Sequence, residues 1–264
     1  RSVTKALRGP RARGATRRSR LPRLPGIAIV LSYILMVVVV LAALLPTLLA
    51  PHDPATQNIA RALRPPAWLP GGTTANLLGT DALGRDILSR VIHGTRVSMV
   101  ISLAAVLLQG TLGLVLGLLA GYFRGWLDSL IMRLADIQLA IPLLALVIAV
   151  VAVVGSSLPI LVVVLGVTGW VVYARVVRSE VLSVRELEFV QAARALGASD
   201  FRIVVKHVLA KVFTSFLVIA TLQIALMILT ESALSFLGLG VQPPTISWGA
   251  MIAQGKDYIA RSEE

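Results

Sequence analysis

Residues whose side chains could do chemistry are few in this chain, and their spacing argues against catalysis. The sequence has no cysteine and three widely separated histidines, so it indicates neither a thiolate site nor a histidine metal site. A phosphate-binding loop of the form G-x-x-x-x-G-K-[ST] is absent, because Gly255 and Lys256 precede Asp257 and lack the upstream spacing. No set of His, Asp and Ser suggests a nucleophilic centre. We therefore expect a protein that is not an enzyme, binds no metal and holds no cofactor of its own.

Polar side chains stand out instead at two places among very apolar residues. The segment FVQAARALGASDFRIVVKH, residues 189–207, carries charge and a central glycine between two apolar runs. Further along, Gln223 and Glu231 lie within or at the end of the last apolar run. Polar groups at membrane depth tend to face a bundle interior or a cavity, so both residues are candidates for lining a translocation pathway. The alternative for Glu231 is a position near the outer end of its helix, where water is available.

Membrane-spanning helices must position these residues. The 264-residue chain is 56% hydrophobic and 14% charged, whereas an average soluble domain has about 25% charged residues. Apolar runs of about 20 residues are long enough to cross a bilayer as helices. We therefore predict an all-α fold, a polytopic bundle of five transmembrane helices. The predicted spans are residues 27–50, 95–121, 134–154, 158–178 and 208–231.

The distribution of positive charge orients this bundle. The formal charge of +12 could indicate a nucleic-acid partner, but the Lys and Arg residues cluster beside the predicted spans, as the positive-inside rule expects. We therefore predict no nucleic-acid binding and a cytoplasmic N-terminus. The predicted regions are a basic cytoplasmic tail (1–26), a first transmembrane helix (27–50), an extracytoplasmic loop (51–94), a transmembrane core (95–232) with cytoplasmic segments at 122–133 and 175–211, and an extracytoplasmic C-terminal segment (233–264).

Three local patterns make further predictions. Small residues at helical spacing in the second predicted span let a neighbouring helix approach closely, and we expect them to serve packing. Arg85 and Asp86 precede the same span, where they shape the start of its helix or, alternatively, gate a substrate. Arg133 and Asp136 are three residues apart and predict an ion pair within one helix. The small residues are Gly113, Gly117 and Gly121.

The polar segment itself predicts two short helices joined by a sharp turn. The first helix covers residues 186–196, and Gly197 follows it at the position where a glycine commonly ends a helix. Ser199 can cap a second helix, with Asp200 in its first turn. The residues alone leave two interpretations open, namely a knob that docks a soluble partner and an interfacial helix lying on lipid. The predicted apolar face consists of Phe189, Ala192, Ala193 and Leu196.

Three stretches resemble the permease subunits of ABC importers. The sequence QAARALGASDFRIVVKHVLA is similar to the EAA loop of these permeases. Residues 77–102 and 232–252 resemble the C-type permease subunits of dipeptide, oligopeptide and nickel importers, and the resemblance extends from the first span to residue 259. The EAA pattern is matched at Ala192, Ala193, Gly197 and Leu209, and it is not matched at Gln191, His207 and Ala210.

The resemblance implies a type I ABC importer in a bacterial or archaeal cytoplasmic membrane. Its expected partners are a second, related permease subunit, two cytoplasmic ATPase subunits or one fused ATPase, an extracytoplasmic substrate-binding protein and the lipid bilayer. ATP and Mg would be bound by the ATPase subunits. The EAA loop, residues 185–207, would dock in a groove on an ATPase subunit. The expected coupling residues are Phe189, Gln191, Ala192, Ala193, Leu196, Gly197, Ala198, Ser199 and Asp200.

The resemblance leaves the cargo and one structural point open. Di- and oligopeptides are the main expectation, and nickel or another small solute is the alternative within the family. A membrane scaffold that transports nothing and a secondary transporter are alternatives of other classes, although the predicted spans lack the central carboxylates that a secondary transporter needs. The family usually has six spans, whereas this sequence predicts five.

Overall fold

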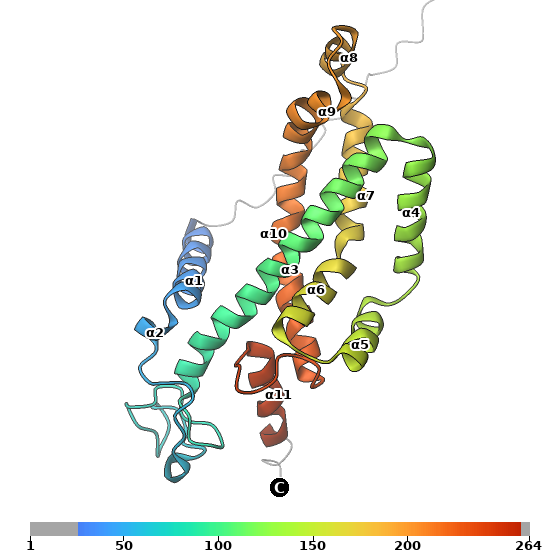
Figure 1. Ribbon diagram of the computed structural model, residues 1–264. Helices are drawn as coiled ribbons and strands as arrows, with labels where there is room; N and C mark the ends of the chain where they lie inside the picture. Colours follow the sequence, from blue (N-terminus) through green and yellow to red (C-terminus); the bar gives the residue numbers. More distant parts are fainter. Residues whose placement is uncertain (1–25, 260–264) are drawn as a thin grey trace, which may run out of the picture. The chain divides into compact units, whose positions relative to one another are not determined.

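The computed structural model describes residues 26–259, except for the side chains of Asp257 and Ile259 (Figure 1). The chain divides into two compact units, Arg1–Val38 and Val39–Glu264. The predicted basic tail, apart from Gly26, lies outside the described residues. The first helix, α1 (Gly26–Leu44), contains no charged residue and exposes nearly all of its side chains. Such a helix is stable only in a surrounding that is itself apolar, as the first predicted span requires.

The described residues are mostly helical, as predicted. The extended pairing in the described residues consists of one isolated bridge between Thr80 and Asp86. The helices after α1 are α2 (Pro46–Leu49), a 3₁₀ turn (Ile59–Arg61), α3 (Ile87–Phe123), α4 (Gly125–Leu139), α5 (Leu143–Val154), α6 (Leu158–Thr168), α7 (Trp170–Val184), α8 (Glu188–Ala195), α9 (Asp200–Ile203), a π-helical turn (Val204–Val208), α10 (Leu209–Phe236) and α11 (Trp248–Ile259).

Helix α3 is the central element, and it begins earlier than predicted, at Ile87 rather than near residue 95. Asp86 is its N-cap, and its carboxylate accepts a hydrogen bond from the Ser89 backbone N–H at 2.8 Å. This bond satisfies a free donor of the first turn. The helix-starting role expected for Asp86 is therefore confirmed, and residues 87–94 of the predicted region 51–94 belong to α3.

The glycine ladder of α3 packs against α7, as predicted. A Cβ atom added at Gly113 would lie 2.4 Å from Cβ of Tyr173, and one at Gly117 would lie 2.7 Å from the Ala174 carbonyl oxygen. At Gly121 the same atom would lie 2.7 Å from Cβ of Val181. Any larger residue would therefore push the two helices apart, because all three neighbouring atoms belong to the α7 backbone or to the first atom of an α7 side chain.

The structure supports four or five spans against the five predicted, and not all of them have the predicted form. Four helices of the described residues are long and apolar enough to cross a membrane, and a fifth span results if the bent pair α4 and α5 counts as one. The predicted continuous helix over 134–154 is wrong, because the chain bends by 82° between α4 and α5. Pro142 explains the break, since proline disfavours helical geometry at the residue before it.

The fourth predicted span also differs, because it extends to Val184 and changes direction at Gly169, between α6 and α7. Residues 125–133 of the predicted cytoplasmic segment 122–133 are helical and form most of α4. The expected ion pair between Arg133 and Asp136 is also wrong. Asp136 instead accepts a bond from Arg175 of α7 at 2.5 Å. The expected pair is replaced because Arg175 on the neighbouring helix lies within bonding distance of Asp136.

A second, stronger ion pair joins the same two helices. Arg178 of α7 donates through Nε and Nη2 to the two oxygens of Asp128 on α4, at 2.5 and 2.6 Å. A bidentate guanidinium–carboxylate pair fixes orientation as well as distance. Helix α4 is thereby attached to the end of α7 from which the chain continues into α8.

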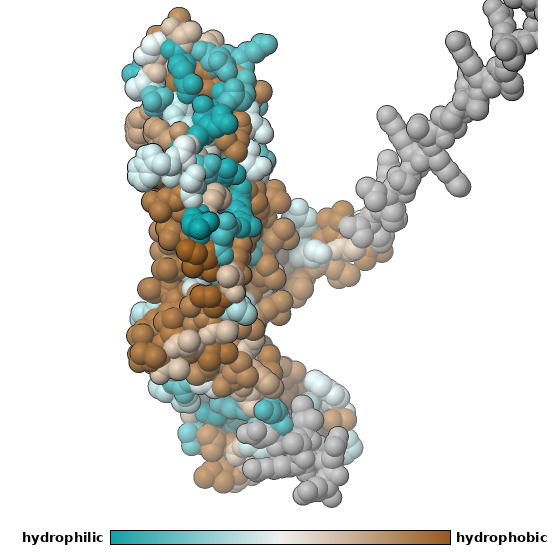
Figure 2. Space-filling model, turned by 90° about the vertical axis from the view of Figure 1, so that its right-hand side faces the viewer, coloured by the Kyte–Doolittle hydropathy of each residue, from teal (hydrophilic) through white to brown (hydrophobic). Residues whose placement is uncertain are grey.

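Polarity divides the unit that begins at Val39 into a middle and two ends (Figure 2). Hydrophobic side chains dominate the middle of the visible face, and hydrophilic ones gather toward both ends. At one end lie α8 and α9, and at the other lie the 51–86 loop and α11, with α3 running between them (Figure 1). This is the pattern expected of a protein that spans a bilayer.

Candidate functional site

The polar segment folds as a rigid knob made of α8, a tight turn and α9. Helix α8 begins at Glu188, two residues later than predicted, and Leu196 is its C-cap. Gly197 follows with φ of +79°, a left-handed conformation that glycine adopts without steric penalty. The N–H of Gly197 bonds the Arg194 carbonyl at 3.0 Å, and the N–H of Ala198 bonds the Ala193 carbonyl at 3.1 Å. These two bonds form a Schellman motif, so the predicted glycine-terminated turn is confirmed.

The second half of the knob continues into the last long span. Ser199 is the N-cap of α9, as predicted, but its side chain makes no capping hydrogen bond. The helix passes through the π-helical turn into α10, so residues Asp200–Phe236 form one membrane-capable segment. His207, which departs from the EAA pattern, lies inside this π turn. Movement of the knob would therefore be transmitted to α10 without a flexible linker.

The side chains of the apolar face predicted for α8 are partly buried against the rest of the chain and partly exposed. Val190, which the sequence did not single out, is the anchor and is 1% exposed. Ala193 is partly buried against the same core cluster, which includes Val181 of α7. Leu196 is 88% exposed, and Phe189 is also exposed. The split arises because α8 packs on α7 and α10 through one narrow side and leaves the other side free.

An exposed apolar surface remains at the tip of the knob. Phe201 of α9 is 79% exposed and adds to Leu196 and Phe189, although sequence reasoning did not select it. A signal was present, because Phe201 follows a helix N-cap in a segment with few aromatic residues. Apolar side chains gathered on a polar end of a protein mark a contact surface. We call Phe189, Leu196 and Phe201 the knob surface.

A basic hollow of about 450 Å³ lies beside Phe189. Lys206 and His207 of the π turn line it, together with Lys211 of α10. The ring centroids of Phe189 and His207 are 6.2 Å apart. The knob surface thus adjoins a cationic region, which suits a partner with acidic residues around an apolar groove.

Tyr122 fastens the knob to the end of α3. Its hydroxyl donates to Asp200 Oδ1 at 2.6 Å and accepts from Arg194 Nη2 at 3.1 Å. Arg185 donates to the Tyr122 carbonyl oxygen. The guanidinium groups of Arg185 and Arg194 lie 5.9 and 5.7 Å from the centre of its ring. One buried tyrosine therefore holds both halves of the knob, and sequence reasoning missed it because its partners are distant along the chain.

A second candidate site is a cavity of about 390 Å³ where two helical segments break. It lies between the α4–α5 bend, the α6–α7 junction and α10, and Gln223 is one of its lining residues. Gln138 of α4 donates to the Thr168 carbonyl and accepts from Trp170 Nε1 at 2.7 Å, so it satisfies backbone and indole groups at the junction. The polar lining residues are Gln109, Gln138, Thr168, Gln223 and Thr230.

One of the residues that line this cavity, Gln109, has a side-chain amide without a hydrogen-bond partner among the described residues. The residue is fully buried, and neither atom of its amide has a hydrogen-bond partner among the described residues. Its side chain packs against Gly169, where an added Cβ would lie 1.5 Å from the amide oxygen. A buried amide without partners is costly unless something else supplies them. Both polar atoms of Gln109 are themselves buried, so a polar solute or water in the cavity would meet the other polar lining residues instead.

Glu231 lies away from the cavity that Gln223 lines. Its carboxylate is 1% exposed and accepts from the hydroxyls of Ser235 at 2.7 Å and Ser98 at 3.3 Å. The same Ser98 oxygen accepts from the Trp248 N–H at 3.2 Å. Glu231 thus joins α10, α3 and α11, so the structure separates the two residues that were expected to share a pathway.

No group of three or more His, Cys, Asp or Glu side chains is arranged to hold a metal ion within the described part of the chain. The two sites can therefore hold a partner surface and a hydrogen-bonding solute, respectively. Neither combines a nucleophile with a general base. What the geometry offers is a surface for a partner at one end and a cavity with polar lining residues in the middle.

Comparison with known proteins gives a consistent result. Residues 113–260 match the family described as binding-protein-dependent transport system inner membrane component. The di/tripeptide transport system permease protein DppC of Pseudomonas aeruginosa (strain UCBPP-PA14) is 44% identical over 227 residues, which cover 86% of this chain and 75% of that protein.

Two other relatives are named after different transported substrates. The dipeptide transport system permease protein DppC of Haemophilus influenzae is 38% identical over 86% of this chain and 77% of its own. The nickel transport system permease protein NikC of Escherichia coli (strain K12) is 41% identical over 87% of this chain and 80% of its own. The family match over residues 113–260 includes the knob, the α3 ladder and the cavity lining except for Gln109.

Proposed function

The chain belongs to the family of binding-protein-dependent transport system inner membrane components, as a permease of the dipeptide, oligopeptide and nickel importers, and we propose that it forms half of a translocation pathway for di- and oligopeptides. In this proposal the pathway is driven by partner ATPase subunits that bind ATP and Mg. A second, related permease subunit supplies the other half. A substrate-binding protein delivers the cargo from the extracytoplasmic side.

The observation that carries the proposal is the knob and its rigid attachment. Leu196 and Phe201 are exposed at a polar end of the chain, although large apolar side chains gain about 1.5–3 kcal/mol when fully buried. A partner that covers them would recover this free energy. The Tyr122 contacts and the continuous α9–α10 segment then supply a stiff path from that partner to the spans. This arrangement supports docking of an ATPase subunit at residues 185–207.

Orientation follows from the same assignment. If the knob receives a cytoplasmic ATPase, then the N-terminal tail is cytoplasmic and the 51–86 loop with α11 is extracytoplasmic. The Lys and Arg residues near the knob agree with this direction. The exposed apolar side of α10, which includes Leu222 and Leu229, would face lipid or the second permease subunit.

The cavity supports peptides as the cargo. Gln223 and Thr230 offer an amide and a hydroxyl group, which can donate to and accept from peptide bonds. Two of the relatives described above are peptide permeases by name. Nickel is the second candidate, favoured by the similarity to NikC. The polar groups of the cavity are weak ligands for such an ion, which prefers imidazole and other nitrogen donors.

Reconstitution of the complete importer tests the proposal. The permease pair, the ATPase subunits and the binding protein are placed in proteoliposomes, and ATP-driven uptake of a radiolabelled dipeptide is compared with uptake of ⁶³Ni²⁺. We expect dipeptide accumulation that depends on ATP. Uptake of nickel alone would replace the peptide assignment with the metal one. A purified chain without ATPase subunits and without uptake would support the scaffold alternative.

A further inference from the structure

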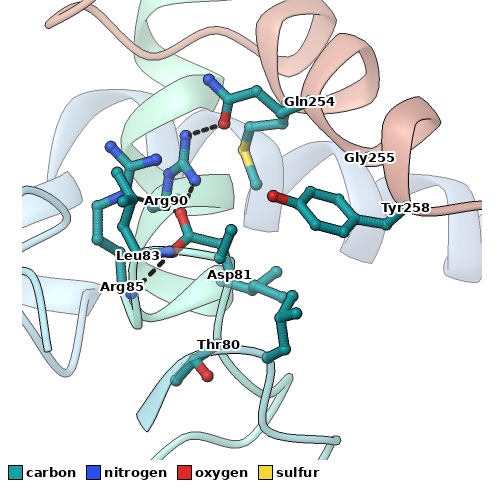
Figure 3. Close-up of a pocket in the computed structure, with 12 residues that line it drawn as sticks. Thr80, Asp81, Leu83, Arg85, Arg90, Gln254, Gly255 and Tyr258 are labelled. Atoms are coloured by element: carbon teal, nitrogen blue, oxygen red, sulfur yellow. Dashed lines mark hydrogen bonds and ion pairs between the residues drawn. The ribbon is translucent and has the colours of Figure 1, made fainter. Parts of the chain in front are cut away.

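A separate pocket (Figure 3) lies between the 51–86 loop and α11, at the opposite end from α8 and α9 in Figure 1. It is a cavity of about 560 Å³ between the 51–86 loop, the first turn of α3 and α11. Its size falls within the range of about 300–1,000 Å³ typical of small-molecule sites. Apolar side chains such as Leu63, Leu83 and Met251 line much of it, and Tyr258 adds an aromatic ring.

The polar part of this pocket contains two guanidinium groups and one carboxylate. Asp81 Oδ2 accepts from Arg85 Nε at 2.7 Å and also from Arg90 Nη1. Asp86, the nearest other acid in the sequence, is bonded instead to Asn76 and Ser89. Among the described side chains of the pocket, two positive charges therefore share one negative charge.

The carboxylate of Asp81 is firmly committed to its present partners. Its other oxygen accepts from the backbone N–H groups of Leu83 and Arg85, each at 2.9 Å. Burial by itself would raise the pKa of Asp81, but the hydrogen bonds from Arg85 and Leu83 and the attraction of Arg90 outweigh it and hold the pKa below its ordinary value. Asp81 is consequently ionised at neutral pH and still neutralises only one of the two cations.

The two arginines play different parts. Arg90 is 3% exposed, and its Nη2 donates to Gln254 of α11 at 2.8 Å, so it joins α3 to α11 and forms the floor. Its Nε is buried without a hydrogen-bond partner among the described residues. Arg85 is more exposed and uses Nε for Asp81, while its two terminal nitrogens make no bond to a described residue. Arg85 thus lines the pocket with its Nε fixed by Asp81 and its two terminal donors unused by the described residues.

We propose that this pocket binds the carboxylate of a small ligand with an apolar side chain, specifically the C-terminal carboxylate of a peptide. A guanidinium binds a carboxylate through two parallel hydrogen bonds, and the excess positive charge of the pocket favours an anion. The apolar walls would take up the side chain next to that carboxylate. The choice of a peptide rests on the proposed function, whereas the preference for a carboxylate rests on the pocket alone.

The shape of the site favours a small ligand over a protein surface. Arg85 lines a concave pocket, whereas protein contacts are usually broad and flat enough to bury about 800 Å² per partner. The site would receive a peptide on the face that we propose to be extracytoplasmic, before the peptide reaches the cavity lined by Gln223.

Two small probes test the inference on the membrane complex of permeases and ATPase subunits in nanodiscs, without the binding protein. Binding of N-acetyl-L-leucine and of its neutral analogue N-acetyl-L-leucinamide is measured by titration calorimetry. We expect the carboxylate to bind at least about tenfold more tightly than the amide, because hydrogen bonds to charged groups contribute about 1.5–3 kcal/mol. Equal binding of the two probes, or no binding of either, would overturn the proposal.

Variants assign the preference to this pocket. Arg85→Gln should abolish it, and Arg85→Lys should keep part of it, since a charge without the fork remains. Arg61→Gln is the matched control, because Arg61 is an exposed arginine of the same loop outside the pocket. Retention of the preference in Arg85→Gln would contradict the proposal, as would its loss in Arg61→Gln.

Two further readouts separate this inference from its alternatives. ATP-driven dipeptide uptake is measured in parallel, so that uptake without a carboxylate preference rejects the pocket proposal and leaves the proposed function standing. Absence of uptake in a complete importer whose pocket still prefers the carboxylate rejects the proposed function alone. If Arg85→Gln weakens docking of the binding protein but leaves the probe preference intact, the pocket contacts an acidic protein side chain and the small-ligand proposal is wrong.

Discussion

At the scale of single residues, Tyr122 and Gly197 determine where the knob lies. Tyr122 supplies one hydroxyl that bonds Asp200 in α9 and Arg194 in α8. Gly197 supplies the left-handed turn between these helices. Neither residue belongs to the knob surface, so changes at either should affect the transmission of movement more than the binding of a partner.

Tyr122→Phe removes the hydroxyl and keeps the ring that the two arginines cover. Two hydrogen bonds with charged side chains are lost, each contributing about 1.5–3 kcal/mol. We expect the importer to assemble and hydrolyse ATP, while dipeptide uptake per ATP falls several-fold. Uptake and phosphate release are measured in the same proteoliposomes. Tyr33→Phe, at an exposed position of α1, is the control, and normal coupling in Tyr122→Phe would contradict the proposed fastening.

Gly197→Val tests the turn. No atom lies within 4 Å of a Cβ at this position, so the substitution causes backbone strain without a clash. A left-handed conformation costs an L-residue about 1–2 kcal/mol, and more when it is β-branched. We expect reduced uptake with near-normal expression. Gly197→Asn is the matched control because asparagine tolerates this conformation. Equal uptake in both variants would show that the turn is not required.

At the scale of elements, α8 and α9 form a lever with one attached side and one free side. Val190 and Ala193 belong to the attached side, and Leu196 and Phe201 belong to the free side. A charge placed at Ala193 would disturb packing within the chain, so it would not report on a partner alone. The free side offers a cleaner experiment.

Leu196→Asp should release the ATPase subunits. The leucine makes little contact with its own chain, being 88% exposed, so the variant should fold and insert normally. In the assembled importer the new charge would be buried and unpaired, at a cost of about 2–5 kcal/mol, or about 30-fold or more in affinity. Co-purification of ATPase subunits in detergent is the measurement. Leu69→Asp, exposed in the 51–86 loop, is the control. A stoichiometric ATPase on Leu196→Asp would exclude this surface as the docking site.

At the scale of the whole molecule, the ends of the unit that begins at Val39 differ in what they can bind. One end presents apolar side chains beside cations, and the other presents a pocket with paired arginines. A cavity at two helix breaks lies between them. In an importer, the arginine pocket would receive the cargo, the cavity would let it pass, and the knob end would contact the subunits that supply the energy.

Cysteine labelling tests the orientation of this arrangement. The chain has no cysteine, so a single introduced one gives no background. Thr74→Cys, exposed in the 51–86 loop, should react with an impermeant maleimide in intact cells. Ala195→Cys, exposed on the knob, should react only after permeabilisation. The reverse pattern would invert the proposed topology and place the knob outside the cytoplasm.

Much of this protein could be predicted from the sequence, because the signals are local. A long apolar run predicts a spanning helix by itself, since the bilayer demands internal hydrogen bonding wherever the run lies. The glycine ladder of α3 and the glycine-terminated turn of α8 are likewise periodic or short-range patterns, and both are confirmed. The resemblance that identified the family rests on the same kind of continuous stretch.

The tertiary structure alone decided which distant residues meet. Asp136 bonds to Arg175 and not to Arg133, Glu231 bonds to serine hydroxyls, and Tyr122 lies between the two halves of the knob. Each outcome depends on the relative rotation of packed helices, and no pattern within one helix encodes that rotation. Helix periodicity predicts which side of a helix is apolar, whereas a specific polar contact also requires the partner helix and its position.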